Sequence, residues 1–497
     1  MIENLMAAFS NVFSFTSITV IFLGVLVGII IGALPGLTTT MGVALLFPLT
    51  FNLEGITGIL MLLGIYCGAG YGGSISSILL NTPGNPGAVV TGLDGYPMAQ
   101  KGEADRALAI STYSSGVGGM FSALVLIFLA PLLATVALQF GPPEFFALAI
   151  FGLSIITSIS GKSILKGLIG GAIGLFIATI GLDSITGMTR FTFDTMYLMG
   201  GVSFIPILIG LFAFSQVLMT VEEGVGENVE KIKVKIQRVL PTKEDIKKTN
   251  YPIFQGSLIG SIIGAIPGTG GDIAAFLSYN QTKKSSKEPE KFGKGAPEGI
   301  AAPEAANNSV TGGAMVPLLT LGIPGDTVTA IILGALMVQG LQPGPLLFTE
   351  HPDQIYGIYT GFILANIFMI ILGFLFIRPF TKVLNIPKPI LTPIILVLCV
   401  VGSFSMNNDI IDVYIMVAAG FIGYFLLKLD FPISPIIIAL VLGPMLESNF
   451  RRSLVMSQGD YSIFMMRPIS AGLILLTVLT LFGPILWNRF KKRESHA

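Results

Sequence analysis

The chain has 497 residues, of which 52% are hydrophobic and 11% are charged, and its 28 basic and 28 acidic side chains give zero net charge. Soluble globular proteins carry roughly 25% charged residues, so this composition excludes a soluble enzyme and predicts an all-α polytopic membrane protein. Balanced charge gives no reason to expect a nucleic-acid partner. Apolar runs of about 20 residues recur along the chain, and we expect roughly 10 to 14 membrane segments.

The first informative segment is a long apolar run that Gly-Ala-Leu-Pro-Gly interrupts at 32–36. The stretches on either side are each about 15 to 17 residues, or roughly 22 to 26 Å as helix, which is short for a span. This pattern predicts a helical hairpin with Pro-Gly at its tip. A helix that starts after the break points unpaired N–H groups into the gap and attracts anions. The predicted carboxylate ligands of this segment are Pro35, Gly36, Thr38, Thr39 and Thr40. For the threonines, helix capping alone is the alternative interpretation.

A second apolar run, YGGSISSILLNTPGNPGAVVTG at 71–92, also breaks at a Pro-Gly pair. Asn81 and Thr82 stand directly before this break, where freed backbone groups need partners inside the bilayer. Either these polar side chains reach the substrate, or they satisfy the backbone at a bent helix end. We include Asn81 and Thr82 among the predicted substrate-binding residues.

The longest polar stretch, at 221–250, separates two halves that repeat each other. Gly-Ala-Ile-Pro-Gly at 264–268 repeats the first broken phrase. Each copy ends a series of glycines at every fourth position, which are Gly24, Gly28 and Gly32 in the first and Gly256, Gly260 and Gly264 in the second. We predict an N-terminal transmembrane repeat at 1–220, a cytoplasmic linker at 221–250 and a C-terminal transmembrane repeat at 251–497.

The second broken phrase carries a carboxylate that the first lacks. Asp272 aligns with Thr40 inside an apolar hairpin, where a charge is costly, so it is a candidate ligand of a coupling cation, Na⁺ or H⁺. Asp326 follows a further Pro-Gly pair and is a second candidate. For both, a helix N-cap is the alternative interpretation. The predicted substrate-binding residues of this half are Gly268, Thr269, Gly270, Gly271, Asn307 and Asn308.

The flanking charges predict opposite orientations for the two repeats, since basic residues near span ends lie on the cytoplasmic side. No Lys or Arg precedes Lys101, and the first broken run is flanked only by Glu3 and Glu54, so both its ends are predicted outside. The second is flanked by the polar linker and by five lysines at 283–294, so both its ends are predicted inside. Inverted repeats with matching broken segments point to the binding site of a secondary transporter.

Two other classes of protein compete with a carrier. A channel needs continuous pore-lining polarity, whereas the polar residues here gather at the breaks. An intramembrane enzyme is disfavoured, because two histidines (His351 and His496) and two cysteines (Cys67 and Cys399) suggest no nucleophile or metal centre. We expect no cofactor other than the coupling cation.

Segments across nearly the whole chain resemble the large membrane subunit of the tripartite tricarboxylate transporters, the TctA family. The segments that carry this resemblance are GALPGLTTTMGVALLFPLTF, YGGSISSILLNTPG, LDGYPMAQKGEADRAL, GAIPGTGGDIAAFLSYN, APEGIAAPEAANNS, LGIPGDTVTAIILGAL and LGPMLESNFRRSLVMSQGD. The resemblance implies a multi-pass protein of the bacterial inner membrane that imports carboxylates by cation-coupled secondary transport. It also implies two partners, a small four-helix membrane subunit and a periplasmic substrate-binding protein. The family resemblance favours the same residues as the breaks do, at 38–40, 268–272 and 307–308.

Overall fold

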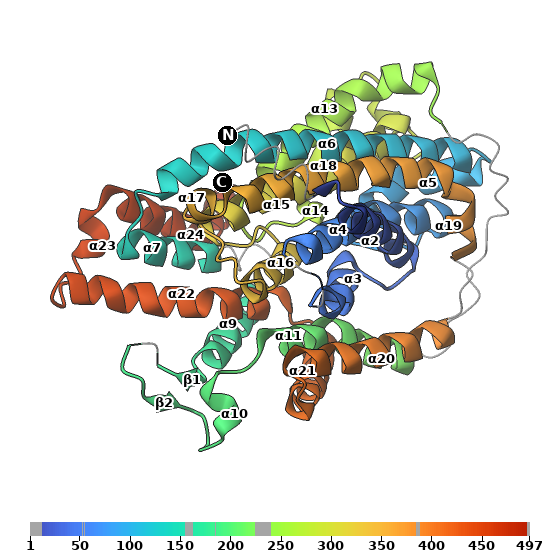
Figure 1. The fold of residues 1–497 in the computed structure, drawn as a ribbon. Helices are drawn as coiled ribbons and strands as arrows, with labels where there is room; N and C mark the ends of the chain where they lie inside the picture. The colour runs from blue at the N-terminus through green and yellow to red at the C-terminus, as the bar shows by residue number, and fades with distance from the viewer. Residues whose placement is uncertain are drawn as a thin grey trace.

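The computed structural model describes residues 12–51, 53, 55–154, 163–183, 185–223, 240–383 and 388–494. In these residues the protein is almost entirely helical, and one antiparallel pair joins the short strands β1 (Gly181–Leu182) and β2 (Thr189–Arg190) (Figure 1). Seven of the described helices are long and apolar enough to cross a membrane, and shorter apolar helices accompany them. The prediction of an all-α polytopic membrane protein is therefore confirmed.

The first half begins with two broken helices and a long third one. The helices break where the sequence predicts, because Pro-Gly and Asn-Thr-Pro-Gly cannot continue an α-helix. The elements of this unit are α2 (Phe15–Ala33), α3 (Thr39–Leu46), the 3₁₀-helix η1 (Phe47–Thr50), α4 (Thr57–Leu80), α5 (Ala88–Gln100) and α6 (Ala104–Ala137).

The second half begins with the same order of elements. They are α13 (Lys243–Ala265), α14 (Gly271–Ser285), the 3₁₀-helix η3 (Pro289–Lys291), α15 (Pro297–Leu321), α16 (Thr327–Val338), α17 (Leu347–Glu350) and α18 (Pro352–Leu375). The Thr282 hydroxyl donates a hydrogen bond to the Gln255 side-chain oxygen at 3.2 Å, so α14 folds back along α13 as a hairpin. Of the predicted linker at 221–250, residues 224–239 lie outside the described residues.

The glycine series explain how the first two long helices of each half pack. Each glycine rests directly on a backbone carbonyl of the neighbouring helix, and any side chain would collide with that oxygen. In the first half Gly24, Gly28 and Gly32 of α2 lie on the carbonyls of Met61, Ile65 and Ala69 of α4. In the second half Gly256, Gly260 and Gly264 of α13 lie on the carbonyls of Ala302, Ala306 and Val310 of α15.

The second breaks of the two halves also pack alike. Gly84 lies against the Gly32 carbonyl, and Gly325 lies against the Gly264 carbonyl, so each second break rests on the end of its own first helix. The first two helices and the second break of each half are therefore packed alike. The halves then interlock, because α6 packs along α15 and α18 packs along α4.

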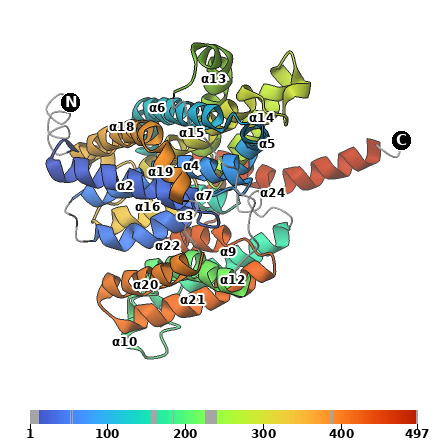
Figure 2. The same cartoon turned by 90° about the vertical axis from the view of Figure 1, so that its right-hand side faces the viewer.

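Most of the remaining helices lie below this core and to its left in Figure 1, and below it in Figure 2. Helix α7 packs on α22 and α24, and α9 packs on α22, while α20 and α21 pack on η2. These elements are α7 (Pro142–Ser154), α9 (Ile164–Ala178), α10 (Met196–Met199), α11 (Phe204–Leu208), the π-helix η2 (Ile209–Phe214), α12 (Ser215–Glu223), α19 (Ile377–Val383), α20 (Lys388–Asn407), α21 (Ile410–Lys428), α22 (Ser434–Met456), α23 (Ile463–Met466) and α24 (Pro468–Glu494).

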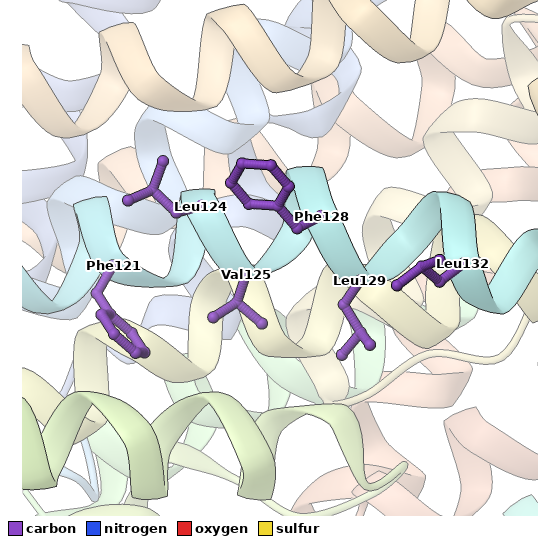
Figure 3. A pocket seen from close by; sticks show the side chains of 6 residues that line it. All are labelled: Phe121, Leu124, Val125, Phe128, Leu129 and Leu132. Atoms are coloured by element: carbon purple, nitrogen blue, oxygen red, sulfur yellow. The ribbon is translucent and has the colours of Figure 1, made fainter.

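A shallow apolar hollow lies along α6, lined by Phe121, Leu124, Val125, Phe128, Leu129 and Leu132 (Figure 3). Phe128 is 69% exposed, as expected for a side chain that faces lipid. Because every lining side chain is apolar, this hollow offers no ligand for a carboxylate.

Candidate functional site

The two Pro-Gly tips share one backbone conformation. Gly36 has φ +90° and Gly268 has φ +78°, both in the left-handed region that strongly favours glycine. At Gly36 the preference for glycine comes from this backbone conformation and not from crowding, because a methyl group there would meet no atom within 4 Å. Beyond the first tip, Thr38 caps α3 by accepting a hydrogen bond from the Met41 N–H at 3.2 Å. Of the other predicted residues here, Gly36 is exposed, while Pro35 and Thr39 are half-buried.

The N-terminus of α3 meets the N-terminus of α16, and we call this contact the α3–α16 junction. Its members are Thr40, Asp326, Thr327 and Tyr66. The hydroxyls of Thr40 and Thr327 are 3.0 Å apart. Asp326 caps α16 by accepting from the Thr329 N–H at 2.8 Å, and its other carboxylate oxygen accepts from the Tyr66 hydroxyl of α4. The capping interpretation of Asp326 is thus what the structure shows, and the carboxylate also ties the two halves together.

The N-termini of α14 and α5 meet at the equivalent place, and we call this contact the α5–α14 junction. Its members are Gly87, Gly271, Asp272 and Asn307. The Asn307 amide donates to the Gly70 carbonyl of α4 at 3.2 Å. A methyl group at either Gly87 or Gly271 would collide with the Asn307 side-chain oxygen, so this amide occupies the gap between the two helix starts.

Asp272 differs from Asp326 in having no hydrogen bond to any part of the chain that the structure describes. It lies in the first turn of α14, whose N-cap is Gly270, and it makes no capping bond. The carboxylate is half-buried beside a helix N-terminus, where the helix dipole favours negative charge. Helix capping therefore does not account for the presence of Asp272, and its carboxylate oxygens are available to bind a ligand.

The other predicted residues serve the backbone around the breaks. The Thr269 hydroxyl donates to the Ile266 carbonyl at 2.8 Å, and the Gly268 N–H donates to the Gly325 carbonyl at 2.7 Å, so the two breaks of the second half touch. Asn81 ends α4 in the left-handed conformation and is exposed, and the Thr82 hydroxyl donates to the Leu80 carbonyl at 3.2 Å.

Asn308 is 2% exposed, and its amide donates to the Glu304 carbonyl at 3.0 Å. It is therefore held inside the bundle, whereas its neighbour Asn307 reaches the junction. Sequence reasoning missed Tyr66 and did not assign a role to Asn85. Asn85 accepts from the Ala88 N–H at the start of α5 at 2.9 Å, although the N-cap of α5 is Gly87, whereas Asp326 is itself the N-cap of α16. Asn85 and Asp326 each follow a Pro-Gly pair directly, and that shared position was the signal for a role at a helix start.

No group of three or more His, Cys, Asp or Glu side chains able to hold a metal ion occurs among the described residues. A cation at Asp272 would therefore be held by one carboxylate together with hydroxyl and carbonyl oxygens, which suits a hard cation.

Charged and polar contacts join loops of the first half to loops of the second half in two separate places. The Lys101 ammonium donates to the Lys294 carbonyl at 2.6 Å, and the Arg106 guanidinium pairs with Asp245 at 2.6 Å. These contacts bring basic residues of both halves together with the predicted cytoplasmic linker and with the lysine-rich loop at 283–294. In the other group, the Gln339 amide after α16 donates to the Leu53 carbonyl at 3.4 Å.

Broken helices whose N-termini meet between apolar, interlocked halves are the architecture of a membrane transporter. The sequence model of the tripartite tricarboxylate transporter TctA family matches residues 18–438. The chain belongs to this family, and it is a multi-pass membrane protein of a transporter type.

Two proteins of Agrobacterium vitis are similar in sequence. One, described as an uncharacterized 52.8 kDa protein in the TAR-I ttuC' 3'region, is 39% identical over 496 residues, covering 100% of this chain and 98% of the relative. The other, described as an uncharacterized protein in the TAR-II ttuC' 3'region, is 39% identical over 236 residues, covering 48% of this chain and 98% of the relative. No solved structure matches this chain.

Proposed function

We propose that this protein imports carboxylates by cation-coupled secondary transport, as the large membrane subunit of a tripartite system in the bacterial inner membrane. One observation carries the proposal, namely that helix N-termini of opposite halves meet at both the α3–α16 junction and the α5–α14 junction. Paired helix N-termini present N–H groups and positive dipole ends, which bind carboxylates without a basic side chain.

The two repeats, in this proposal, have opposite orientations in the membrane. The gathering of Lys101, Arg106 and Lys294 at one group of loops supports this arrangement, because the positive-inside rule places such residues in the cytoplasm. Its test is the labelling of single cysteines introduced as Glu54→Cys in the first half and as Lys283→Cys, an exposed position, in the second half. We expect labelling from opposite sides, and labelling from the same side would contradict the inversion. The native cysteines are 1% and 0% exposed and should give little background.

The cation, Na⁺ or H⁺, is proposed to act at the α5–α14 junction through Asp272. Support comes from the half-buried carboxylate that makes no hydrogen bond with the described residues. Asp326 is the weaker candidate, because both its oxygens already accept hydrogen bonds.

A small four-helix membrane subunit and a periplasmic substrate-binding protein complete the proposed system. The family membership supports them, because it is the family of tripartite transporters. Uptake by proteoliposomes, with the cognate small subunit and binding protein and across a panel of mono-, di- and tricarboxylates, tests the proposal. We expect saturable uptake of at least one carboxylate that depends on a cation gradient.

A channel of the same architecture is the second candidate, and it makes a different prediction. A carrier exchanges external labelled substrate for internal unlabelled substrate against a gradient, whereas a channel only dissipates gradients. Ohmic currents without counterflow would therefore exclude the carrier.

A further inference from the structure

Glu304 is a fully buried carboxylate that the junctions do not use. It lies on α15 and is 0% exposed. Its Oε1 accepts a hydrogen bond from Thr91 of α5 at 2.5 Å, and its Oε2 accepts from Ser115 at 2.7 Å and Ser111 at 3.2 Å, both of α6. The carboxylate of the second half is thus enclosed by hydroxyl groups of the first half.

The enclosing hydroxyls are held by a further layer of hydrogen bonds. The Ser111 and Ser74 hydroxyls are 2.8 Å apart, and Ser74 donates to the Tyr71 carbonyl at 2.7 Å. The Tyr71 hydroxyl in turn lies 2.7 Å from that of Thr112. This network fixes the surroundings of Glu304 before any ligand arrives.

No basic side chain of the described residues pairs with Glu304. The charged groups on the packed helices are engaged elsewhere: Asp94 of α5 with Tyr279 of α14 at 2.9 Å and with backbone N–H groups, and Arg106 of α6 with Asp245 of α13. Tyr71 of α4 is a titratable neighbour that belongs to the same hydrogen-bond network, and Asp272 lies in the first turn of α14 at the α5–α14 junction. Because an unpaired charge inside a membrane protein is costly, this carboxylate is stable here when it carries a proton.

The oxygen spacing favours a proton over a metal cation. Ligands that surround a hard cation at about 2.4 Å stand roughly 3.4 Å from one another in octahedral geometry. The three hydroxyls instead contact Glu304 at hydrogen-bond distances of 2.5, 2.7 and 3.2 Å. A proton needs no extra room, since the hydroxyls only rotate to match a carboxylic acid.

The repeated architecture shows that the scaffold does not need this carboxylate. Ala302 and Ala306 of α15 take the places of Met61 and Ile65 of α4, so Glu304 takes the place of Leu63. Leu63 is 0% exposed and fills the same helix position with an apolar side chain. Burying the Glu304 carboxyl group costs desolvation free energy that Leu63 does not cost at the equivalent position. The presence of an acid at only one of the two positions therefore indicates a function.

Glu304 lies one helical turn from the junction. The Asn308 amide donates to the Glu304 carbonyl, and its neighbour Asn307 reaches between Gly87 and Gly271. Thr91 lies on α5, whose N-terminus forms the same junction. A change of charge at Glu304 therefore acts on the helices α5 and α15 that shape the α5–α14 junction.

We propose that Glu304 is the proton-binding site of the transport cycle, taking up one proton as a carboxylic acid on one side of the membrane and releasing it on the other. The inference rests on the proposed carboxylate transport and makes it more specific, because it assigns proton coupling to Glu304 and leaves Asp272 for a metal cation. The proton is neither created nor consumed, and it moves with the carboxylate.

Infrared difference spectroscopy of the purified protein tests the protonation without transport. Wild type, shifted between acidic and alkaline pH, should show the carbonyl band of a buried carboxylic acid, and Glu304→Gln should lack it. Glu298→Gln is the matched control, because it makes the same chemical change near the start of α15 at a half-buried position. A spectrum unchanged by Glu304→Gln would overturn the proposal.

Transport in proteoliposomes tests the coupling. Glu304→Gln, which keeps an acceptor for the hydroxyls, should lose accumulation driven by a pH gradient and keep carboxylate counterflow, which needs no net proton movement. Glu298→Gln should keep both activities.

Two results would overturn the assignment of the proton to Glu304 without affecting the proposal of carboxylate transport. One is accumulation by Glu304→Gln that still depends on the pH gradient, and the other is wild-type uptake that does not depend on it. The absence of any carboxylate uptake by wild type would refute the proposed function, while the infrared band still reports on Glu304.

Discussion

The two halves present the same backbone at their breaks and different side chains around them. Both tips carry glycine in the left-handed conformation, and both second breaks rest on the last glycine of the first helix of their own half. At the α3–α16 junction the polar groups satisfy one another, with Thr40 beside Thr327 and Tyr66 on Asp326. At the α5–α14 junction, Asp272 has no hydrogen bond to the described residues.

The two halves therefore share a backbone arrangement at their breaks and differ in the chemistry of the side chains around it. Paired polar groups inside a membrane protein stabilise a contact, whereas a carboxylate without a protein partner costs free energy unless a ligand binds it. We therefore propose that the cation chemistry lies in the second half, at Asp272 and Glu304. Four substitutions test this view, from the largest expected effect to the smallest.

Gly268→Val should abolish transport while the protein still inserts into the membrane. A β-branched residue at φ +78° is strained by about 1 to 3 kcal/mol. Relaxation of this strain would change the backbone at the tip and move the N–H groups at the start of α14. Uptake and surface expression are the measurements. Gly200→Val is the control, since Gly200 has φ −74° and an added methyl group would meet nothing within 4 Å. Normal uptake by Gly268→Val would show that the tip geometry is dispensable.

Asp272→Asn should weaken the dependence of uptake on the metal-cation gradient and leave expression unchanged. The amide keeps the shape of the side chain and removes the charge that attracts a cation. Asp326→Asn is the comparison, because the asparagine oxygen can still cap α16 while its amide N–H donates to the Tyr66 hydroxyl. An unchanged cation response in Asp272→Asn, or its loss in Asp326→Asn, would reverse the roles of the two junctions.

Tyr66→Phe should lower the stability of the purified protein by about 2 kcal/mol, because it leaves a carboxyl oxygen of Asp326 without its hydrogen-bond partner between the halves. Thermal unfolding in detergent measures the effect. Tyr359→Phe serves as the control, since the buried Tyr359 hydroxyl has no hydrogen-bond partner among the described residues. Equal losses of stability in the two variants would mean that the hydrogen bond between Tyr66 and Asp326 does not stabilise the protein.

Arg106→Gln should have the smallest effect, about 1 kcal/mol at neutral pH, because Arg106 is 33% exposed and its ion pair is partly screened. Burial works to raise the pKa of Asp245, but hydrogen bonds from Arg106 and Thr242 lower that pKa overall. A lowered pKa in the folded state contributes stability above the ordinary Asp value, and the contribution fades as the pH falls below it. The difference between wild type and Arg106→Gln should therefore shrink in acid, and a constant difference would contradict the assignment.

The local features of the fold follow from the sequence. A Pro-Gly pair inside an apolar run disfavours a continuous helix, so the breaks before Thr39 and after Ala265 were predictable, and α14 returns along α13 as the predicted hairpin does. The repeat was predictable because glycines at every fourth position lie on one helix face and allow another helix to approach closely.

The contacts between the halves did not follow from the sequence. Periodicity places Tyr66 on a helix, but its partner Asp326 depends on how two distant breaks meet. Asn307 was selected for its position on a helix face, yet its place between Gly87 and Gly271 required the fold. The serines and threonine around Glu304 resemble ordinary helix-packing residues, and only their convergence distinguishes them.

Substrate protection of single cysteines tests most directly the claim that both junctions line one carboxylate site. Thr39→Cys and Asn307→Cys place a thiol at half-buried positions of the two junctions, and the native cysteines are buried. The account predicts that a transported carboxylate slows modification of both thiols, whereas its uncharged amide analogue does not. Modification at the same rate with and without the carboxylate would contradict a site at the junctions.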